Sequence, residues 1–153
     1  MPFAALGVWE SDEMSSHVIP CLRYNDAPQA IEWLCETFGF VKRMVVEQEG
    51  GGIAHAELIL NDGMVMLGSA RNDDFGQHLG VADPKRPVTQ SIYMIVDDAD
   101  AMYQRAREAG ASIVMELTNT DYGSRDFSCR DLEGHLWSFG TYNPWSGHTE
   151  LLE

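Results

Sequence analysis

The chain has 153 residues, which is the length of one ordinary domain or of two small units that share a core. Its 24 acidic and 10 basic residues give a formal net charge of −14, and such a field repels phosphate backbones, so neither nucleic acid nor an anionic membrane is expected as a partner. No apolar run approaches the ~20 residues that a membrane-spanning helix needs. Residues 1–16 contain no basic residue, which argues against a secretory signal.

The first half of the chain predicts one helix and four strands. The segment 18–24 is a strand that ends at Asn25-Asp26, either of which can cap the helix that follows. Pro28 is tolerated in the first helical turn, and Gly39 ends the helix after Phe38. The tripeptide Asn61-Asp62-Gly63 is typical of a hairpin. Further strands are expected at 41–47, 53–60 and 64–68.

The second half repeats this order after a polar linker at 71–89. Strands are expected at 91–96, 112–117, 125–130 and 135–142, and a helix at 99–109. We therefore interpret 17–142 as a single domain made of two units, 17–70 and 90–142, with an N-terminal arm at 1–16 and a C-terminal tail at 143–153. Trp9 in the arm and Trp145 in the tail are large aromatics in polar segments, which often become buried at an interface.

A repeat of 72 positions relates the two halves. Asp26 and Asp98 both follow a short apolar strand and precede a helix, and they are 72 positions apart. The strands 63–67 and 135–139 agree with the same offset. Two elements with one offset indicate a duplicated β-α-β-β-β unit, and a duplicated unit predicts a pseudo-symmetric cleft between its copies.

Three motifs carry a resemblance to a known family. They are Ala30-Ile31-Glu32-Trp33 with Phe38-Gly39, then Val96-Asp97-Asp98-Ala99-Asp100-Ala101, and finally Tyr122-Gly123-Ser124-Arg125 with Asp131-Leu132-Glu133-Gly134-His135-Leu136-Trp137. Their order over 18–142 resembles the vicinal oxygen chelate superfamily, which includes glyoxalase I, extradiol dioxygenases, fosfomycin resistance proteins and bleomycin-binding proteins. The resemblance implies an α+β fold in which tandem βαβββ units form a curved mixed sheet around a cleft.

The same resemblance indicates where a metal would be held. Metal enzymes of the superfamily draw His or Glu ligands from the first and last strand of each unit, because a divalent metal prefers imidazole nitrogen or carboxylate oxygen. Carried onto this chain, the four positions are Ile19, Met66, Ser91 and Ser138. None is a ligand of the expected kind, so we expect no metal and no cofactor.

Strand alternation divides the side chains between two faces of the sheet. The predicted helix-facing core is Val18, Leu22, Tyr24, Val65, Leu67, Ile92, Met94, Val96, Trp137 and Phe139. The predicted ligand-binding residues on the cleft side are Ile19, Cys21, Arg23, His55, Glu57, Met64, Met66, Ser91, Tyr93, Leu136, Ser138 and Tyr142, with Ile95 beside them. An apolar face with a few polar groups is typical of a small-molecule pocket, although the same residues could instead fill a second core.

Two groups of polar residues have alternative interpretations. His55 and Glu57 point the same way from one strand, so they could act as a base or as two metal ligands with His17, or they could form an ion pair on a solvated face. His135, in a turn, is interpreted as a packing residue. Arginines that could anchor an anionic ligand, or pair with nearby acids, are Arg23, Arg125 and Arg130.

The preferred hypothesis is a metal-independent protein of the bleomycin-resistance-like or PhnB-like branch, which binds an amphipathic small molecule as a homodimer in a resistance or sequestration role. The alternative is a lyase or isomerase whose metal is held off-pattern by His17, His55 and Glu57, and the third is a structural dimer module without a ligand. No catalytic residue is assigned. The chain is expected in the cytoplasm with reduced thiols, because Cys21, Cys35 and Cys129 are odd in number and widely spaced.

Overall fold

The structure is a computed structural model, and it describes residues 15–146. The elements of the first unit are β1 (Cys21–Tyr24), α1 (Ala27–Phe38), β2 (Val41–Glu47), β3 (Ile53–Leu60) and β4 (Gly63–Ser69). The linker contains a short 3-10 turn (Phe75–Gln77). The elements of the second unit are β5 (Ile92–Ile95), α2 (Ala99–Glu108), β6 (Ser112–Asn119), β7 (Arg125–Arg130) and β8 (Leu136–Gly140).

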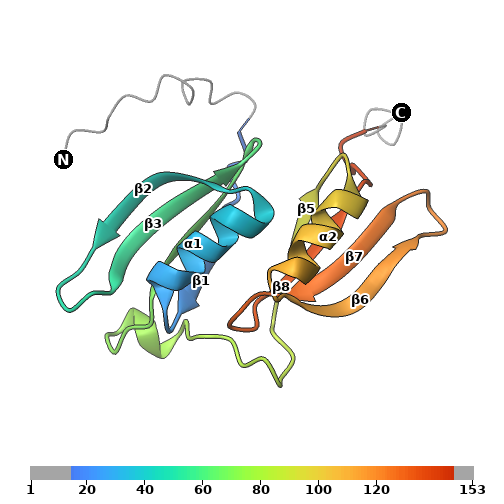
Figure 1. Cartoon of the computed structure of the whole chain (residues 1–153). Coiled ribbons are helices and arrows are strands. Elements are labelled where there is room, and N and C mark those ends of the chain that lie inside the picture. Colours follow the sequence, from blue (N-terminus) through green and yellow to red (C-terminus); the bar gives the residue numbers. More distant parts are fainter. Residues whose placement is uncertain (1–14, 147–153) are drawn as a thin grey trace.

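Each unit forms one four-stranded mixed sheet. The strand orders are β1-β4-β3-β2 and β5-β8-β7-β6, in which the first pair is parallel and the others are antiparallel. The two units lie side by side, and the linker joins them along one end of the molecule (Figure 1). The predicted α+β fold with tandem βαβββ units is confirmed.

The predicted repeat extends to the register of the strands. Cys21 lies opposite Met66 in the first sheet, and Tyr93 lies opposite Ser138 in the second. Both members of the second pair follow those of the first by 72 positions. The parallel strand pairs therefore present equivalent positions in the two units.

Equivalent aspartates begin the two helices. Asp26 Oδ1 accepts a hydrogen bond of 3.1 Å from the Gln29 amide, and Asp98 Oδ1 accepts one of 3.0 Å from the Ala101 amide. Each carboxylate satisfies an amide that the first helical turn leaves without a partner. Gly39 ends α1 with a φ of 88°, a left-handed conformation that glycine adopts without steric cost.

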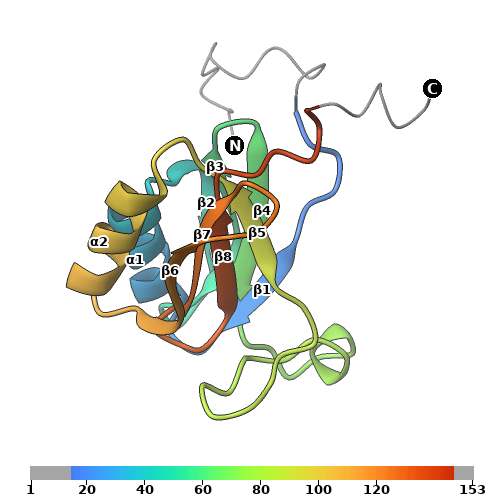
Figure 2. The same cartoon turned by 90° about the vertical axis from the view of Figure 1, so that its right-hand side faces the viewer.

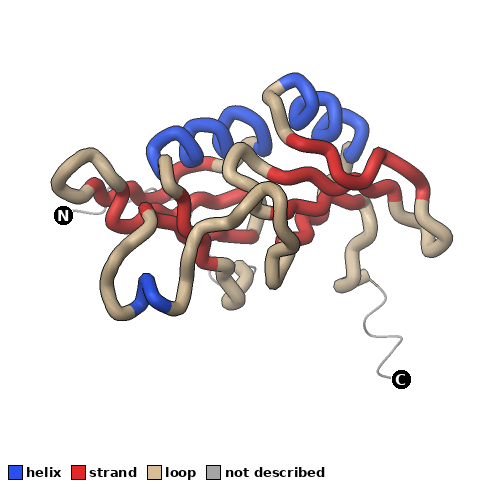
Figure 3. The backbone as a smooth tube through the Cα atoms, turned by 90° about the horizontal axis from the view of Figure 1, so that it is seen from below, coloured by secondary structure: helices blue, strands red, loops and turns tan. Residues whose placement is uncertain are grey.

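Both helices cover the same side of the strands (Figures 2 and 3). Between helices and strands lies one hydrophobic core that includes residues of both units. Phe38 joins the halves, with its ring centroid 5.3 Å from that of Trp137 and 4.7 Å from that of Phe139. The Trp33 indole N–H adds a hydrogen bond of 2.8 Å to the Ala109 carbonyl. The opposite side of the sheets carries neither of the α-helices of residues 15–146 and is called the open face below.

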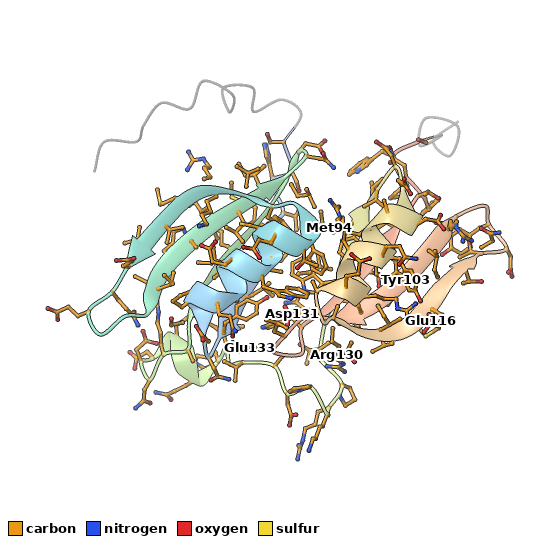
Figure 4. The ribbon with its side chains drawn as sticks, in the orientation of Figure 1. Met94, Tyr103, Glu116, Arg130, Asp131 and Glu133 are labelled. Atoms are coloured by element: carbon orange, nitrogen blue, oxygen red, sulfur yellow. The ribbon has the colours of Figure 1, made fainter. Side chains whose placement is uncertain are left out.

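The turn between β7 and β8 docks the second unit onto the first. Asp131 Oδ2 accepts hydrogen bonds from the Tyr24 hydroxyl at 2.6 Å and from the Trp137 indole N–H at 3.1 Å. Glu133 accepts from the amides of Asn25 and Asp26 at 2.6 and 2.8 Å. Both acidic side chains lie between the two units (Figure 4). This turn is part of the third motif, and its acidic residues act here as structural acceptors.

The start of the first strand was predicted wrongly. The segment 18–24 was expected to be strand, but β1 begins at Cys21, and Val18, assigned to the core, is 84% exposed. Pro20 has no amide hydrogen to donate to a neighbouring strand, so regular pairing begins only after it. The predictions for the arm at 1–16 and the tail at 143–153 fall largely on residues 1–14 and 147–153, which lie outside the described residues, as does Trp9.

Within residues 15–146, no helix is long and apolar enough to cross a membrane.

Candidate functional site

The open face carries most of the predicted site residues. In each strand they alternate with buried core residues, such as Leu22, Val65 and Trp137, so their side chains project away from the helices. Cross-strand neighbours bring Met66 beside both Cys21 and Glu57. The predicted residues on this face are Cys21, Arg23, His55, Glu57, Met64, Met66, Tyr93, Leu136 and Ser138. The structure brings these residues to one face, and their role in ligand binding stays a prediction.

The other predicted residues lie at strand ends. Ile19 lies two residues before β1, Ser91 immediately precedes β5, and Tyr142 lies two residues after β8. These three residues therefore lie outside the regular strand pairing, whereas the predicted strands 18–24, 91–96 and 135–142 included them. Tyr142 nevertheless remains close to β5, because its carbonyl accepts a hydrogen bond of 2.8 Å from the Tyr93 hydroxyl.

A groove of about 1010 Å³ runs between the segment before β1, the β3–β4 hairpin and β5. Of the predicted residues it is lined by Met64, Ser91 and Tyr93. Its lining also includes His17, which the sequence placed only in the alternative metal set, and five residues not assigned to a site: Phe40, Leu60, Met94, Asp97 and Trp145. Of these five, only Trp145, exposed at 75%, had a sequence signal, as an aromatic in a polar tail. The rest line the groove because the two units meet there, which no local pattern reports.

Polar groups of the first unit form a network on the open face. Glu57 accepts a hydrogen bond of 2.7 Å from Arg43 Nη1 through one oxygen and lies 2.7 Å from His55 Nε2 through the other. His55 and Glu57 are therefore close enough to form an ion pair, which was one of the interpretations from the sequence. Arg43 was missed because a register shift between Lys42 and Met44 interrupts the alternation of β2 at this point.

The off-pattern metal set is not assembled. His17 lines the groove, whereas His55 and Glu57 contact each other elsewhere on the open face. Across residues 15–146, no three His, Cys, Asp or Glu side chains are grouped so that they could hold a metal ion. At one of the family's ligand positions, Ser138 instead shares a hydrogen bond of 2.7 Å with Ser128.

Two of the three candidate arginines are engaged within the chain. Arg125 forms two hydrogen bonds, of 2.9 and 3.1 Å, to the carboxylate of Asp100. Arg130 donates to the carbonyls of Gly134 and Arg86 at 2.7 and 2.8 Å, which holds the linker against the β7–β8 turn. The third candidate, Arg23, takes part in none of the ion pairs between described residues.

Three tyrosines gather at the end of the second sheet. The rings of Tyr122 and Tyr142 are 5.5 Å apart and nearly perpendicular, and the Tyr122 hydroxyl donates to Asp126 at 3.1 Å. Burial raises the pKa of Tyr93, whose hydroxyl secures the chain after β8. Since Tyr93 is still 40% exposed, its ring contributes apolar surface to the groove.

His135 has the packing role expected from the sequence. Its ring centroid lies 4.7 Å from that of Tyr24, and its Nε2 is 2.8 Å from the Arg23 carbonyl. The second unit therefore supports the end of β1 from which Arg23 projects.

The sequence model of the Glyoxalase/Bleomycin resistance protein/Dioxygenase superfamily matches residues 15–139 of this chain. The chain belongs to this superfamily. An uncharacterised protein of Mycobacterium tuberculosis is 35% identical over 141 residues, which cover 86% of this chain and 79% of that protein.

Solved structures of the superfamily share the fold. The crystal structure of TioX from Micromonospora sp. ML1 is similar with a TM-score of 0.67 and 32% identity, covering 84% of this chain and all (100%) of that one. The fosfomycin resistance protein FosX from Listeria monocytogenes, solved with Mn(II) and sulfate, has a TM-score of 0.61 at 12% identity and covers 91% of this chain and 98% of its own. At that identity, the likeness to FosX shows the fold alone.

Proposed function

We propose that this chain is a homodimeric, metal-independent member of the superfamily that binds an amphipathic small molecule, in the manner of its bleomycin-resistance-like and PhnB-like branches. The observation that carries the proposal is the open face, where apolar side chains with a few polar groups adjoin a groove of about 1010 Å³. Small-molecule sites are built from such surfaces. Methionines suit the role because their flexible thioethers adapt to irregular ligands.

The dimer is supported by the open face, which neither of the described α-helices covers. Both helices lie on one side of the sheets, so the open face of a lone chain leaves Tyr93 40% and Trp145 75% exposed. Apolar surface of this kind in soluble proteins marks an interaction site. A second copy of the chain, packed across the open face, would cover it and turn the shallow surface into a cleft.

Metal independence is supported by the side chains at the four positions where metal enzymes of the family hold their ligands. Ile19, Met66, Ser91 and Ser138 offer no imidazole or carboxylate, and Ser138 is hydrogen-bonded to Ser128. Binding without chemistry would suffice for sequestration. The three thiols form no disulfide, which fits a reducing cytoplasmic location.

The decisive experiment combines three measurements on the full chain. Light scattering over a range of concentrations should report twice the 17.1 kDa chain mass, and a mass that stays at one chain at every concentration would refute the dimer. Elemental analysis of protein purified without chelator should find Zn, Ni, Mn and Fe well below one per chain. A thermal-shift screen of amphipathic small molecules should give stabilising hits, and a screen without any would favour the structural module.

A further inference from the structure

The open face of the first unit holds an arginine, Arg23, that forms no ion pair with any residue of the described part of the chain. Arg23 lies on β1 opposite Gly68 of β4. A Cβ atom at position 68 would come within 2.6 Å of Arg23 Nη1, so the guanidinium lies directly over the backbone of Gly68. The absence of a side chain at this position is what lets the arginine cross the sheet surface.

Arg23 lacks the partners that its position demands. Its Nε atom is buried, and no hydrogen-bond acceptor reaches it within the described residues. The charge of Asp73 acts against the lowering of the Arg23 pKa, but Asp73 Oδ1 accepts from the Gly76 amide at 2.8 Å, and none of the ion pairs between described residues joins Asp73 to Arg23. A buried donor without an acceptor costs free energy, and more so when it carries charge.

A second guanidinium strengthens the positive potential. Arg71, just after β4, donates to the Ala54 carbonyl and acts electrostatically on Arg23. Burial, with Arg71 as the second cause, lowers the pKa of Arg23, which is the response of a cation that is short of negative charge. Arg125, by contrast, has its pKa raised by the carboxylate of Asp100.

We propose that Arg23, together with Arg71, forms a subsite for an anionic group, a carboxylate or a phosphate, on the ligand of the open face. The inference rests on the proposed function and adds the chemistry of the ligand. The ligand's apolar part would lie over Met66 and Cys21, which neighbour Arg23 on the open face. A guanidinium recognises both kinds of anion through paired N–H donors. The chain's overall negative charge weakens the attraction of simple anions, so phosphate or acetate alone should bind the subsite only at high concentration, and the ligand's apolar part adds affinity and selectivity.

The test observes the arginine directly. In 1H-15N NMR spectra of the full chain, the Nε–Hε signal of Arg23 is assigned by its loss in Arg23→Gln. Inorganic phosphate is titrated in one series and acetate in another, at constant ionic strength adjusted with chloride. We expect the Arg23 signal to shift saturably with at least one anion, whereas the Arg125 signal, already paired with Asp100, stays in place. The series that saturates at lower concentration identifies the preferred group.

A second measurement uses variants. Arg23→Gln should weaken binding of the effective anion about tenfold or more, the usual effect of losing a hydrogen bond to a charged group, while the matched control Arg125→Gln should leave it unchanged. An Arg23 signal that neither anion moves, or equal affinity in Arg23→Gln, overturns the subsite. Neither result touches the dimer or the binding of neutral amphipathic compounds, so failure of this inference is separable from failure of the proposed function.

Discussion

The hydroxyl of Tyr24 donates a buried hydrogen bond of 2.6 Å to Asp131, and these two residues belong to different βαβββ units. The same carboxylate accepts from the amides of Glu133, Gly134 and His135 at 3.0 to 3.1 Å. A single side chain therefore shapes the β7–β8 turn and binds that turn to the first unit. The relative placement of the two units, and with it the groove between them, depends on this contact.

Replacing Asp131 should destabilise the protein strongly. Asp131→Ala leaves the buried Tyr24 hydroxyl and the Trp137 indole N–H without an acceptor, and we expect a loss of about 3 kcal/mol or more in the free energy of unfolding. Tyr24→Phe removes one donor only and should cost about 1 kcal/mol. The exposed ion-pair residue Asp100 is the control, since Asp100→Ala should leave the free energy of unfolding almost unchanged. Urea unfolding measures all three, and equal losses for Asp131→Ala and Asp100→Ala would contradict the role of Asp131.

A methyl group at Gly140 should be poorly tolerated. Its Cβ would come within 2.5 Å of the Tyr93 hydroxyl and 2.6 Å of Asp126 Oδ1. We expect Gly140→Ala to cost about 1–3 kcal/mol, the usual cost of overpacking, and to displace Tyr93 from the Tyr142 carbonyl. Gly80, where nothing lies within 4 Å of a built Cβ, is the matched control. Thermal unfolding of both variants compares them, and identical melting temperatures would show that Tyr93 moves aside freely.

Stability should fall at alkaline pH through Cys129. Burial raises the pKa of its thiol from 9.0 to about 12, with the Asp131 carboxylate contributing in the same direction. Because the folded state holds the proton more tightly than the unfolded state, this contribution is complete below pH 9 and is lost as the pH rises toward 12. The slope is at most ~1.4 kcal/mol per pH unit. Burial also raises the pKa of Tyr24, which adds to the loss at higher pH.

Urea unfolding at pH 8 and pH 10 measures this effect. The decrease in the free energy of unfolding between the two conditions should be about 1 kcal/mol smaller in Cys129→Ala than in the unmodified chain. Cys21→Ala, which removes an exposed thiol, should keep the full decrease. If both variants lose the same stability, the buried thiol does not govern the alkaline limit.

Met66 distinguishes a ligand surface from a second core. Met66→Glu places a carboxylate among apolar groups, so affinity for a hit from the thermal-shift screen should fall about tenfold or more. The fold should survive, because the open face lets the carboxylate stay hydrated. Met115→Glu, at a residue 64% exposed on β6, should change neither binding nor stability. Unfolding of Met66→Glu would show that Met66 is core and that no ligand binds over it.

The sequence by itself determined the order of elements and the repeat, because these depend on local patterns. Alternation and hairpin signals located β3 and β7 at their observed bounds, and the acidic caps placed both helices. The offset of 72 residues also relates the observed pairs Cys21–Met66 and Tyr93–Ser138, because register follows when the same pattern of buried residues is repeated, although the sequence predicted the repeat and not these pairs. Val18 was wrongly assigned to the core because Pro20 interrupts the strand pairing. The alternation of apolar residues does not reveal such an interruption.

Tertiary structure decided which polar residues have partners and where the units meet. The sequence treated Arg23, Arg125 and Arg130 alike. Packing shows that Asp100 binds Arg125 and that two carbonyls bind Arg130, whereas Arg23 lies over Gly68 without an ion pair to any described residue. The groove likewise depends on how β5 packs beside the β3–β4 hairpin. Ion pairs, hydrogen bonds between distant side chains and grooves arise from contacts between residues far apart in the sequence. The local periodicity of one sequence contains no information about such contacts.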